Sequence, residues 1–213
     1  MPTPLEKARK DPESMKAKIL KGARIVFGEY GYHGATTRMI ADVIGVDIST
    51  VYYHWGEKSD LYEAVVLDVY ADLREMLADV EKVIHGKPLT DRLDIALDMT
   101  SDYLFDHPEI SNLILFRYFG KTRDEAGLDF MVPEIISDIA YSMGLCKDKK
   151  KVSAGVNMQV MLMMNSIHNF VSGEGFFRSI LDIPRDEYVA KAKETLKFML
   201  IPPYNGTSRQ GGA

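Results

Sequence analysis

The chain has 213 residues, of which 46% are hydrophobic and 27% charged, a composition typical of a globular protein with a full core. It lacks an apolar signal region and any run near the roughly 18 apolar residues of a membrane span, and its single cysteine, Cys146, has no disulfide partner, so we predict a cytoplasmic protein. The net charge of −5 disfavours a nucleic-acid partner for the chain as a whole.

The first 60 residues have a more basic balance than the rest of the chain. They carry nine Lys and Arg against eight Asp and Glu (+1), whereas the remainder carries 17 against 23 (−6). Basic residues cluster at and before the first predicted helix, where phosphates are within reach, although a solvated helix face has the same pattern. These residues are Lys7, Arg9, Lys10, Lys16, Lys18, Lys21 and Arg24. Charge alone therefore does not identify DNA binding.

The chain is predicted to begin with a mobile segment followed by a helix. Residues 1–13 are rich in proline and charge and are expected to form a flexible basic tail. The first helix is predicted to start after Ser14, as its N-cap, and to end at Gly31, a residue suited to the position just past a helix.

Two short helices about a tight turn are predicted between Thr36 and Trp55. Thr36 is a good N-cap for the first, which carries an apolar stripe expected to pack on a core: Met39, Ile40, Val43 and Ile44. Gly45 stands where a helix end needs a left-handed residue, and Asp47 is expected to cap a second helix from Ile48 to Trp55. Eight residues make a helix that neighbours must hold. This pattern predicts a helix-turn-helix that binds DNA.

The second helix of this motif divides into two faces. Val51 and Trp55, four residues apart, are predicted to face the core, which leaves Tyr53 and His54 toward solvent. An outward Tyr-His pair is unusual on a helix that is merely solvated. The alternative is a small surface hairpin whose aromatic side chains belong to the core.

The segment from about Ile19 to Leu61 resembles the tetracycline-repressor (TetR) family of bacterial transcriptional regulators. The resemblance rests on a helix with a late aromatic residue, a Gly-aromatic pair, Thr-Thr, Ile-Ala, Gly-Val, a run of aromatics and Lys-x-x-Leu. In this chain these are Phe27, Gly31-Tyr32, Thr36-Thr37, Ile40-Ala41, Gly45-Val46, Tyr52-Tyr53-His54-Trp55 and Lys58-Ser59-Asp60-Leu61. The resemblance implies a transcriptional regulator, and we predict a repressor that leaves an inverted-repeat DNA operator when a small effector binds.

The outward positions of the motif give the predicted DNA contacts. Thr37, Tyr52 and Lys58 are expected to hold phosphates. Base edges are expected to meet Arg38, Ile48, Thr50, Tyr53 and His54.

The rest of the chain also shows helical periodicity and no convincing strand. We predict an all-α fold of about nine helices, with a three-helix DNA-binding head (14–60), a helical ligand-binding and dimerisation domain (61–201) and a flexible C-terminal tail (202–213). Helices after the motif are predicted over residues 58–84, 90–106, 109–119, 128–143, 148–171 and 184–201, and Gly173-Glu174-Gly175 is expected to be a loop.

The last two predicted helices carry the pattern of a dimer interface. The helix over 148–171 is apolar on two faces, so one face is expected to pack on its own domain and the other on a second copy. The alternative is a fully buried helix in a monomer. The resemblance implies a homodimer built from these helices, with predicted interface residues Val160, Met163, Ile167, Leu196 and Leu200.

The resemblance also implies an effector pocket among the fourth to eighth predicted helices. Candidate lining residues are apolar or aromatic with a few polar tips: Tyr70, Tyr103, Phe116, Tyr118, Met158, Met161, Asn165 and His168. Each of them taken singly is also compatible with a core position. Methionine-rich walls suit irregular ligands, so we expect a hydrophobic or amphipathic small molecule.

An enzyme and a protein-binding adaptor are the two alternatives to a DNA-binding regulator. The five histidines and Cys146 show no metal-ligand spacing, and no Gly-rich phosphate loop follows a strand, so we predict no catalytic residues, no metal and no cofactor. A helical adaptor that binds protein and not DNA is the other alternative, and an enzyme is the less favoured one.

Overall fold

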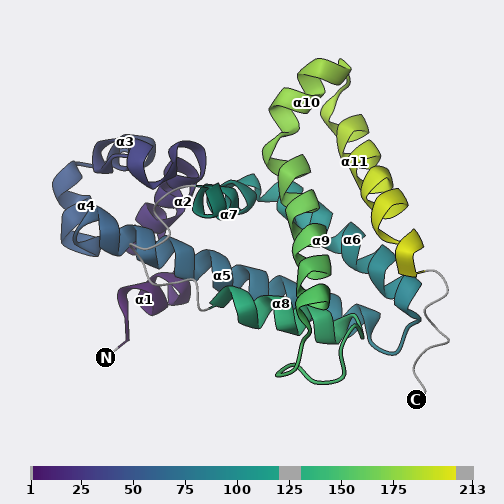
Figure 1. Cartoon of the computed structure of the whole chain (residues 1–213). Helices are drawn as coiled ribbons and strands as arrows, with labels where there is room; N and C mark the ends of the chain where they lie inside the picture. The colour runs from purple at the N-terminus through teal and green to yellow at the C-terminus, as the bar shows by residue number, and fades with distance from the viewer. Residues whose placement is uncertain (1, 120–130, 205–213) are drawn as a thin grey trace. The chain divides into compact units, whose positions relative to one another are not determined.

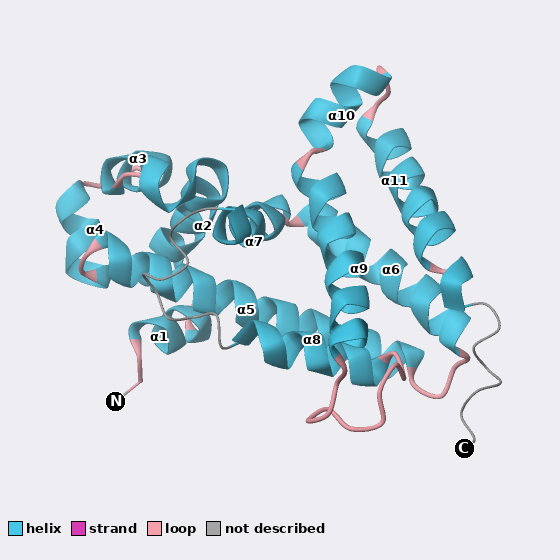
Figure 2. Cartoon of the chain, viewed as in Figure 1, coloured by secondary structure: helices cyan, strands magenta, loops and turns pink. Residues whose placement is uncertain are grey.

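The computed structural model describes residues 2–119 and 131–204, and the regular structure in these ranges is entirely helical (Figures 1 and 2). It contains eleven α-helices, two more than predicted, and a final 3₁₀ turn at Pro202–Tyr204. None of the helices in these ranges is long and apolar enough to cross a membrane. The all-helical prediction is confirmed, and the count of about nine was wrong.

The described residues form two compact units, 2–72 with 108–119, and 73–107 with 131–204. The long helix α5 (Lys58–Ile84) contributes its first part to one unit and its last part to the other. The first unit also contains α1 (Pro4–Lys10), α2 (Met15–Gly34), α3 (Thr37–Ile44), α4 (Ile48–Trp55) and α7 (Pro108–Phe119). It is therefore larger than the predicted head of residues 14–60.

Helix α2 is the centre of the first unit and packs against α3 and α7. Ile19, Ala23 and Phe27 on α2 are fully buried, and the Phe27 ring meets the edge of Tyr62 of α5 at 5.0 Å between centroids. Gly28 lets α7 approach closely, because a Cβ there would lie 2.8 Å from the Cβ of Glu109. This contact explains why α7 joins the N-terminal unit.

Residues 4–10 form helix α1, which replaces most of the predicted flexible tail. Thr3 and Glu6 make a capping box, in which the Thr3 hydroxyl accepts from the Glu6 amide (3.1 Å) and the Glu6 carboxylate accepts from the Thr3 amide (2.7 Å). Pro4 stands at the first helical position, where its missing N–H has no consequence. The capping-box signal was present in the sequence and was outweighed by the tail's composition.

The second unit contains α6 (Leu89–Asp106), α8 (Met131–Ser142), α9 (Ala154–Ser172), α10 (Glu174–Leu181) and α11 (Arg185–Leu200). Helix α9 contacts α6, α8, α10 and α11, and α6 also packs along α11 (Figure 1). The core of this unit includes Leu97 of α6, Val160 of α9 and Leu196 of α11, which are all buried. The first three residues of the helix predicted over 128–143, residues 128–130, lie outside the described residues.

Helix α10 is the second element that the sequence did not predict. It begins directly after Gly173, where a loop was expected, and none of its residues is buried. The Phe177 ring folds back over Gly173, which leaves no room for a Cβ, and lies 6.2 Å from the ring of Phe170. Its apolar residues nevertheless have helical spacing, so a periodicity signal was present in the sequence: Phe176, Phe177, Ile180 and Leu181.

Candidate functional site

The turn between α3 and α4 is built largely as predicted. The Thr36 hydroxyl accepts from the Met39 amide (3.2 Å), and Gly45 has the left-handed conformation, with φ 72° and ψ 40°. Asp47 stands at the N-cap of α4, but its side chain makes no capping hydrogen bond there, which corrects its expected role. Val43, placed on the inward stripe by periodicity, is 54% exposed. Other contacts must therefore hold α4.

The inner face of α4 provides those contacts. Val51 and Trp55 are buried, as predicted. The Trp55 indole N–H donates to the Lys16 carbonyl (3.1 Å), while the Lys16 ammonium donates to the His54 carbonyl and lies 5.5 Å from the Trp55 ring centroid. A cation at the last carbonyls of a helix also complements the helix dipole. Lys16 therefore fixes the C-terminal end of α4 to α2.

The outer face of α4 is aromatic and accessible. Tyr53 is 85% exposed and meets the His54 ring edge-on, with 5.1 Å between centroids. Partial burial, followed by the charge of Lys16, lowers the pKa of His54, so this imidazole is mostly neutral at pH 7 and offers one donor and one acceptor. The pair is suited to reading hydrogen-bonding edges.

The other predicted DNA-contact side chains keep access to solvent to different degrees. Arg38 and Tyr52 are exposed, and Thr37, Ile48 and Thr50 are half-buried. They come from α3 and α4, which contact each other within one compact unit. Their assignment to phosphates or to base edges stays a prediction.

Lys58 has a structural role that its predicted phosphate contact did not include. Its ammonium donates to the carbonyls of Tyr32 (2.9 Å) and Ala35 (3.1 Å) and lies 4.4 Å from the Tyr32 ring centroid. Two of its three N–H donors are thus used to hold the segment between α2 and α3 to the start of α5. One N–H donor is left, and the phosphate contact of Lys58 stays a prediction.

Two arginines of the predicted basic cluster are bound to acids of α5. Arg24 pairs with Asp68 (2.7 Å), Asp72 and, on α7, Glu109 (3.3 Å), and Arg9 of α1 pairs with Asp68 (2.7 Å) and Asp72 (2.9 Å). Their charges are therefore already compensated, whereas the lysines of the cluster other than Lys16 are exposed. We call these five side chains the charge cluster of the first unit.

The charge cluster was missed because the basic residues were interpreted without their partners. Asp68 and Asp72 are four residues apart on a helix that is otherwise apolar toward the core, and Asp68 is buried. Buried carboxylates are nearly always paired. Their spacing was the signal that could have predicted arginine partners.

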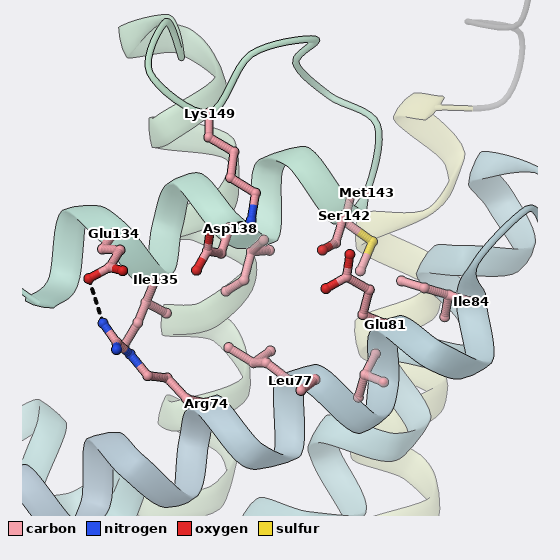
Figure 3. Close-up of a pocket in the computed structure, with 13 residues that line it drawn as sticks. Arg74, Leu77, Glu81, Ile84, Glu134, Ile135, Asp138, Ser142, Met143 and Lys149 are labelled. Atoms are coloured by element: carbon pink, nitrogen blue, oxygen red, sulfur yellow. Dashed lines mark hydrogen bonds and ion pairs between the residues drawn. The ribbon is translucent and has the colours of Figure 1, made fainter.

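The second unit contains a cavity of about 200 Å³ between α5 and α8, which we call the α5–α8 cavity (Figure 3). Its apolar wall includes Leu77, Val80, Ile135, Ile139 and Met143, and charged side chains from α5, α8 and Lys149 also line it. A smaller inner cavity of about 40 Å³ shares Leu77, Val80, Ile139 and Met143 with it and extends to α6 and α9. These hollows are the structural candidates for an effector site.

The predicted effector residues do not line these two cavities, and their assignment to an effector site stays a prediction. Phe116 and Tyr118 belong to the first unit and are exposed, with Phe116 packed over Gly31. The remaining six are either outward or placed elsewhere in the core: Tyr70, Tyr103, Met158, Met161, Asn165 and His168. Met163, Met164 and Ile167 of α9 line the inner cavity instead.

The predicted dimer-interface residues are buried within the single chain. Exposed fractions of 0–7% place Val160, Met163, Ile167, Leu196 and Leu200 in the core of the second unit. The opposite faces expose the large apolar side chains Met158 and Leu162 of α9, Phe176 and Ile180 of α10, and Phe198 and Met199 of α11. Periodicity identified two apolar faces on α9, but the face predicted to form the dimer interface is the one that is buried in the chain's own core.

Buried His168 gives the second unit a predicted dependence on acid. Burial lowers the pKa of His168 to about 4, from 6.5. Below pH 6.5 the unfolded imidazole takes up a proton while the folded one stays neutral, so stability is full above 6.5 and is lost as the pH falls toward 4. Between pH 7 and 5 we expect wild type to lose about 2 kcal/mol more than His168→Gln in urea unfolding. Equal losses in the two proteins would contradict this expectation.

The described residues do not bring together three His, Cys, Asp or Glu side chains that could hold a metal ion. Residues 19–65, which contain most of α2, all of α3 and α4 and the start of α5, match the family model of bacterial regulatory proteins of the tetR family. The match covers 47 of the 213 residues, so the likeness to this family is shown for this segment. The match includes Thr37, Arg38, Lys58 and every predicted contact on α4.

Curated proteins that are similar to this chain are transcriptional regulators. It is 28% identical over 104 residues to the HTH-type transcriptional repressor AcnR of Corynebacterium glutamicum, covering 44% of this chain and 55% of AcnR. It is 26% identical over 143 residues to the HTH-type transcriptional regulator RutR of Escherichia coli, covering 66% of this chain and 60% of RutR. The chain spans about half the length of the first AcnR relatives that it matches.

Solved structures of similar fold cover more of the chain. The fatty acid degradation regulator FadR of Bacillus halodurans has a TM-score of 0.60 at 15% identity, with 86% of this chain and 94% of FadR covered. FadR of Bacillus subtilis in complex with stearoyl-CoA has a TM-score of 0.58 at 17% identity, with 87% and 97% covered. At these identities the likeness shows the fold alone.

Proposed function

We propose that the protein is a homodimeric DNA-binding transcriptional repressor whose operator affinity falls when a small molecule binds its second unit. The observation that carries the proposal is the accessible Tyr53–His54 face of α4, held on a buried base in a helix-turn-helix. The similarity to the repressor AcnR and the family-model match over residues 19–65 support it.

The fixed base of α4 supports a reading role for this helix. Trp55 and Lys16 anchor its C-terminal end, and Lys58 ties the start of α5 to the segment before α3. Specific readout requires side chains held in one geometry against the base edges of the major groove. In this proposal α4 enters the groove, and the exposed lysines of α1 and α2 add attraction to phosphates.

Helix α5 provides the link between effector and DNA in this proposal. It is 27 residues long, or about 40 Å at 1.5 Å per residue, and it runs from Lys58 to Ile84, which lines the α5–α8 cavity. If α5 can adopt two positions, a ligand that binds the protein more tightly in one of them increases the population of that state. Both ends of the helix then move together. Two heads at a changed separation no longer fit successive major grooves together.

The homodimer in this proposal uses the outward faces of α9, α10 and α11. Large apolar side chains are exposed on these faces and are not part of the core of the single chain. Exposed apolar side chains that adjoin one another in a patch mark protein interfaces, and the proposal is that these side chains form such a patch. A two-fold dimer requires an inverted-repeat operator with half-site centres about 34–36 Å apart or a multiple of this distance.

Replacement of Tyr53 tests the reading role of α4. Tyr53→Ala should weaken binding to the DNA upstream of the protein's own gene by about tenfold, while binding to unrelated DNA changes little, because base contacts and not phosphate contacts are lost. Fluorescence anisotropy with the two DNA fragments at one salt concentration measures both affinities. Tyr30→Ala, at an exposed tyrosine of α2 outside the motif, is the matched control.

The same assay tests the dimer's geometry. Inserting about five base pairs between the half-sites places them on opposite faces of the duplex and should abolish tight binding. A protein that retains no DNA, or that binds one asymmetric half-site as a monomer, contradicts the proposed function. Unchanged operator affinity of Tyr53→Ala would leave α4 without a role in recognition.

A further inference from the structure

The charged side chains of the α5–α8 cavity do not balance one another. Arg74 of α5 pairs with Glu134 of α8, and Lys149 pairs with Asp138 of α8 at 2.7 Å (Figure 3). Glu81 of α5 also lines the cavity but has no ion-pair or hydrogen-bond partner in the described part of the chain. Three carboxylates against two cations leave one negative charge.

Glu81 is separated from the cations that could neutralise it. It lies seven residues beyond Arg74 on α5, a rise of about 10 Å along the helix axis. The hydrogen bond to Asp138 raises the pKa of Lys149, and the charge of Glu81 adds only a smaller contribution. Figure 3 shows Glu81 toward the Ser142–Met143 end of the cavity, away from the Arg74–Glu134 pair.

The interior behind this carboxylate is apolar. Leu77, Val80, Ile139 and Met143 form the wall that the α5–α8 cavity shares with the inner cavity. Among the residues lining the inner cavity, Thr100 is the one with a polar side chain, and its hydroxyl donates only to the Met76 sulfur, at 3.8 Å. A hydrocarbon group therefore fits behind a negative rim.

The volume limits the size of the hydrocarbon group. A cavity of about 150 Å³ can hold benzene. The α5–α8 cavity, at about 200 Å³, therefore accommodates one aromatic ring or a short alkyl chain. Flexible Met143 stands on the shared wall, so movement of its side chain would extend the available space inward.

We propose that the α5–α8 cavity binds a small lipophilic cation, with its ammonium group against Glu81 and its hydrocarbon group against Leu77 and Ile139. An anion of the same shape would meet an uncompensated carboxylate, while both basic side chains are already engaged. The regulatory consequence rests on the proposed function, since this ligand would act as the effector. Binding itself does not depend on DNA.

Three ligands with one carbon skeleton test the charge preference. They are benzylamine, benzyl alcohol and benzoate, which carry a cation, a neutral group and an anion at neutral pH. Isothermal titration calorimetry with the full chain should find the amine about five- to tenfold tighter than the alcohol, and the acid weakest of the three. A different order in wild type overturns the proposal, as does no binding of the amine at millimolar concentration.

Variants at Glu81 connect the preference to the residue. Glu81→Gln should remove the difference between amine and alcohol, and Glu81→Lys, which changes the rim from one net negative to one net positive charge, should make the acid the tightest ligand. Glu81 is exposed, so both variants are expected to fold. Glu75→Gln, an exposed acid of α5 outside the cavity lining, is the matched control and should keep the wild-type order.

The outcome separates this inference from the proposed function. An amine preference that survives Glu81→Gln overturns the cation site even if the protein binds its operator. An amine that binds through Glu81 in a protein that retains no DNA confirms the site and contradicts the regulator. Release of operator DNA by the amine from wild type, with about tenfold more amine needed for Glu81→Gln, would support both.

Discussion

Arg24→Met should lower the free energy of unfolding by about 3 kcal/mol, because the substitution leaves buried carboxylate charge without its closest cation. Arg24 is mostly buried and bonds Asp68 and Asp72 of α5 together with Glu109 of α7. Burial alone would lower the pKa of Arg24, but the two aspartates raise it, so the charge is retained. Urea unfolding monitored by circular dichroism, at one protein concentration and pH 7, measures the loss.

Arg9→Met is the matched control for the Arg24 experiment. Arg9 bonds the same two aspartates from α1, but its side chain is 30% exposed, so solvent replaces part of the lost interaction. The expected loss is about 1 kcal/mol. Combining Arg24→Met with Asp68→Asn should recover part of the stability, since Arg9 alone cannot balance both aspartates and one excess negative charge is then removed. An Arg24→Met protein as stable as wild type would show that the cluster contributes no net stability.

The charge cluster also has a consequence for DNA recognition. It joins α1, α2 and α7 to the first part of α5, and α2 in turn holds α4 through Lys16. Ion pairs and hydrogen bonds therefore connect the helices of the first unit on several sides of its core. In the proposed mechanism this rigidity lets a displacement of α5 move the whole reading head.

The motif could be predicted well because its signals are local. Thr36 caps the helix that follows it, Gly45 takes the left-handed conformation that its position requires, and α4 begins at Ile48 and ends at Trp55 as expected. Each of these features depends on residues within one or two turns. The same reason explains the correct limits of α5, Lys58 and Ile84.

Tertiary partners were much harder to predict. Nothing near Lys58 in the sequence indicates that its ammonium will bond the carbonyls of Tyr32 and Ala35. Arg24 likewise finds its acids 44 and 48 residues further along the chain. A single sequence gives the charge and spacing of such residues, but the fold decides whether they meet a phosphate or a carboxylate.

The choice of helix faces follows the same rule. Apolar spacing placed Val160, Met163 and Ile167 on one face of α9, and the structure confirms that they share it. Periodicity does not say which of two apolar faces turns toward the chain's own core. For the same reason the sequence did not show that Met158 and Met161, two of the predicted effector residues, lie on the outward side of α9.

Leu162→Glu with Phe198→Glu should convert the proposed dimer into folded monomers. These two side chains are 60% and 80% exposed in the single chain, so glutamates there disturb no core contact. In a dimer formed by the outward faces of α9 and α11 they would be buried charges without partners, each costing several kcal/mol. That cost corresponds to more than about a hundredfold weaker dimerisation, which sedimentation velocity can measure.

Leu196→Glu distinguishes the two faces of α11. Leu196 is 1% exposed, so a glutamate there should unfold the second unit and abolish its cooperative unfolding transition, whereas the Leu162→Glu, Phe198→Glu protein keeps its helical circular dichroism. The folded monomer should also bind operator DNA far more weakly than wild type, since each head loses the effective concentration supplied by its twin. A double variant that sediments as an intact dimer would place the interface away from these faces, and with it the geometry by which α5 sets the spacing of the two heads.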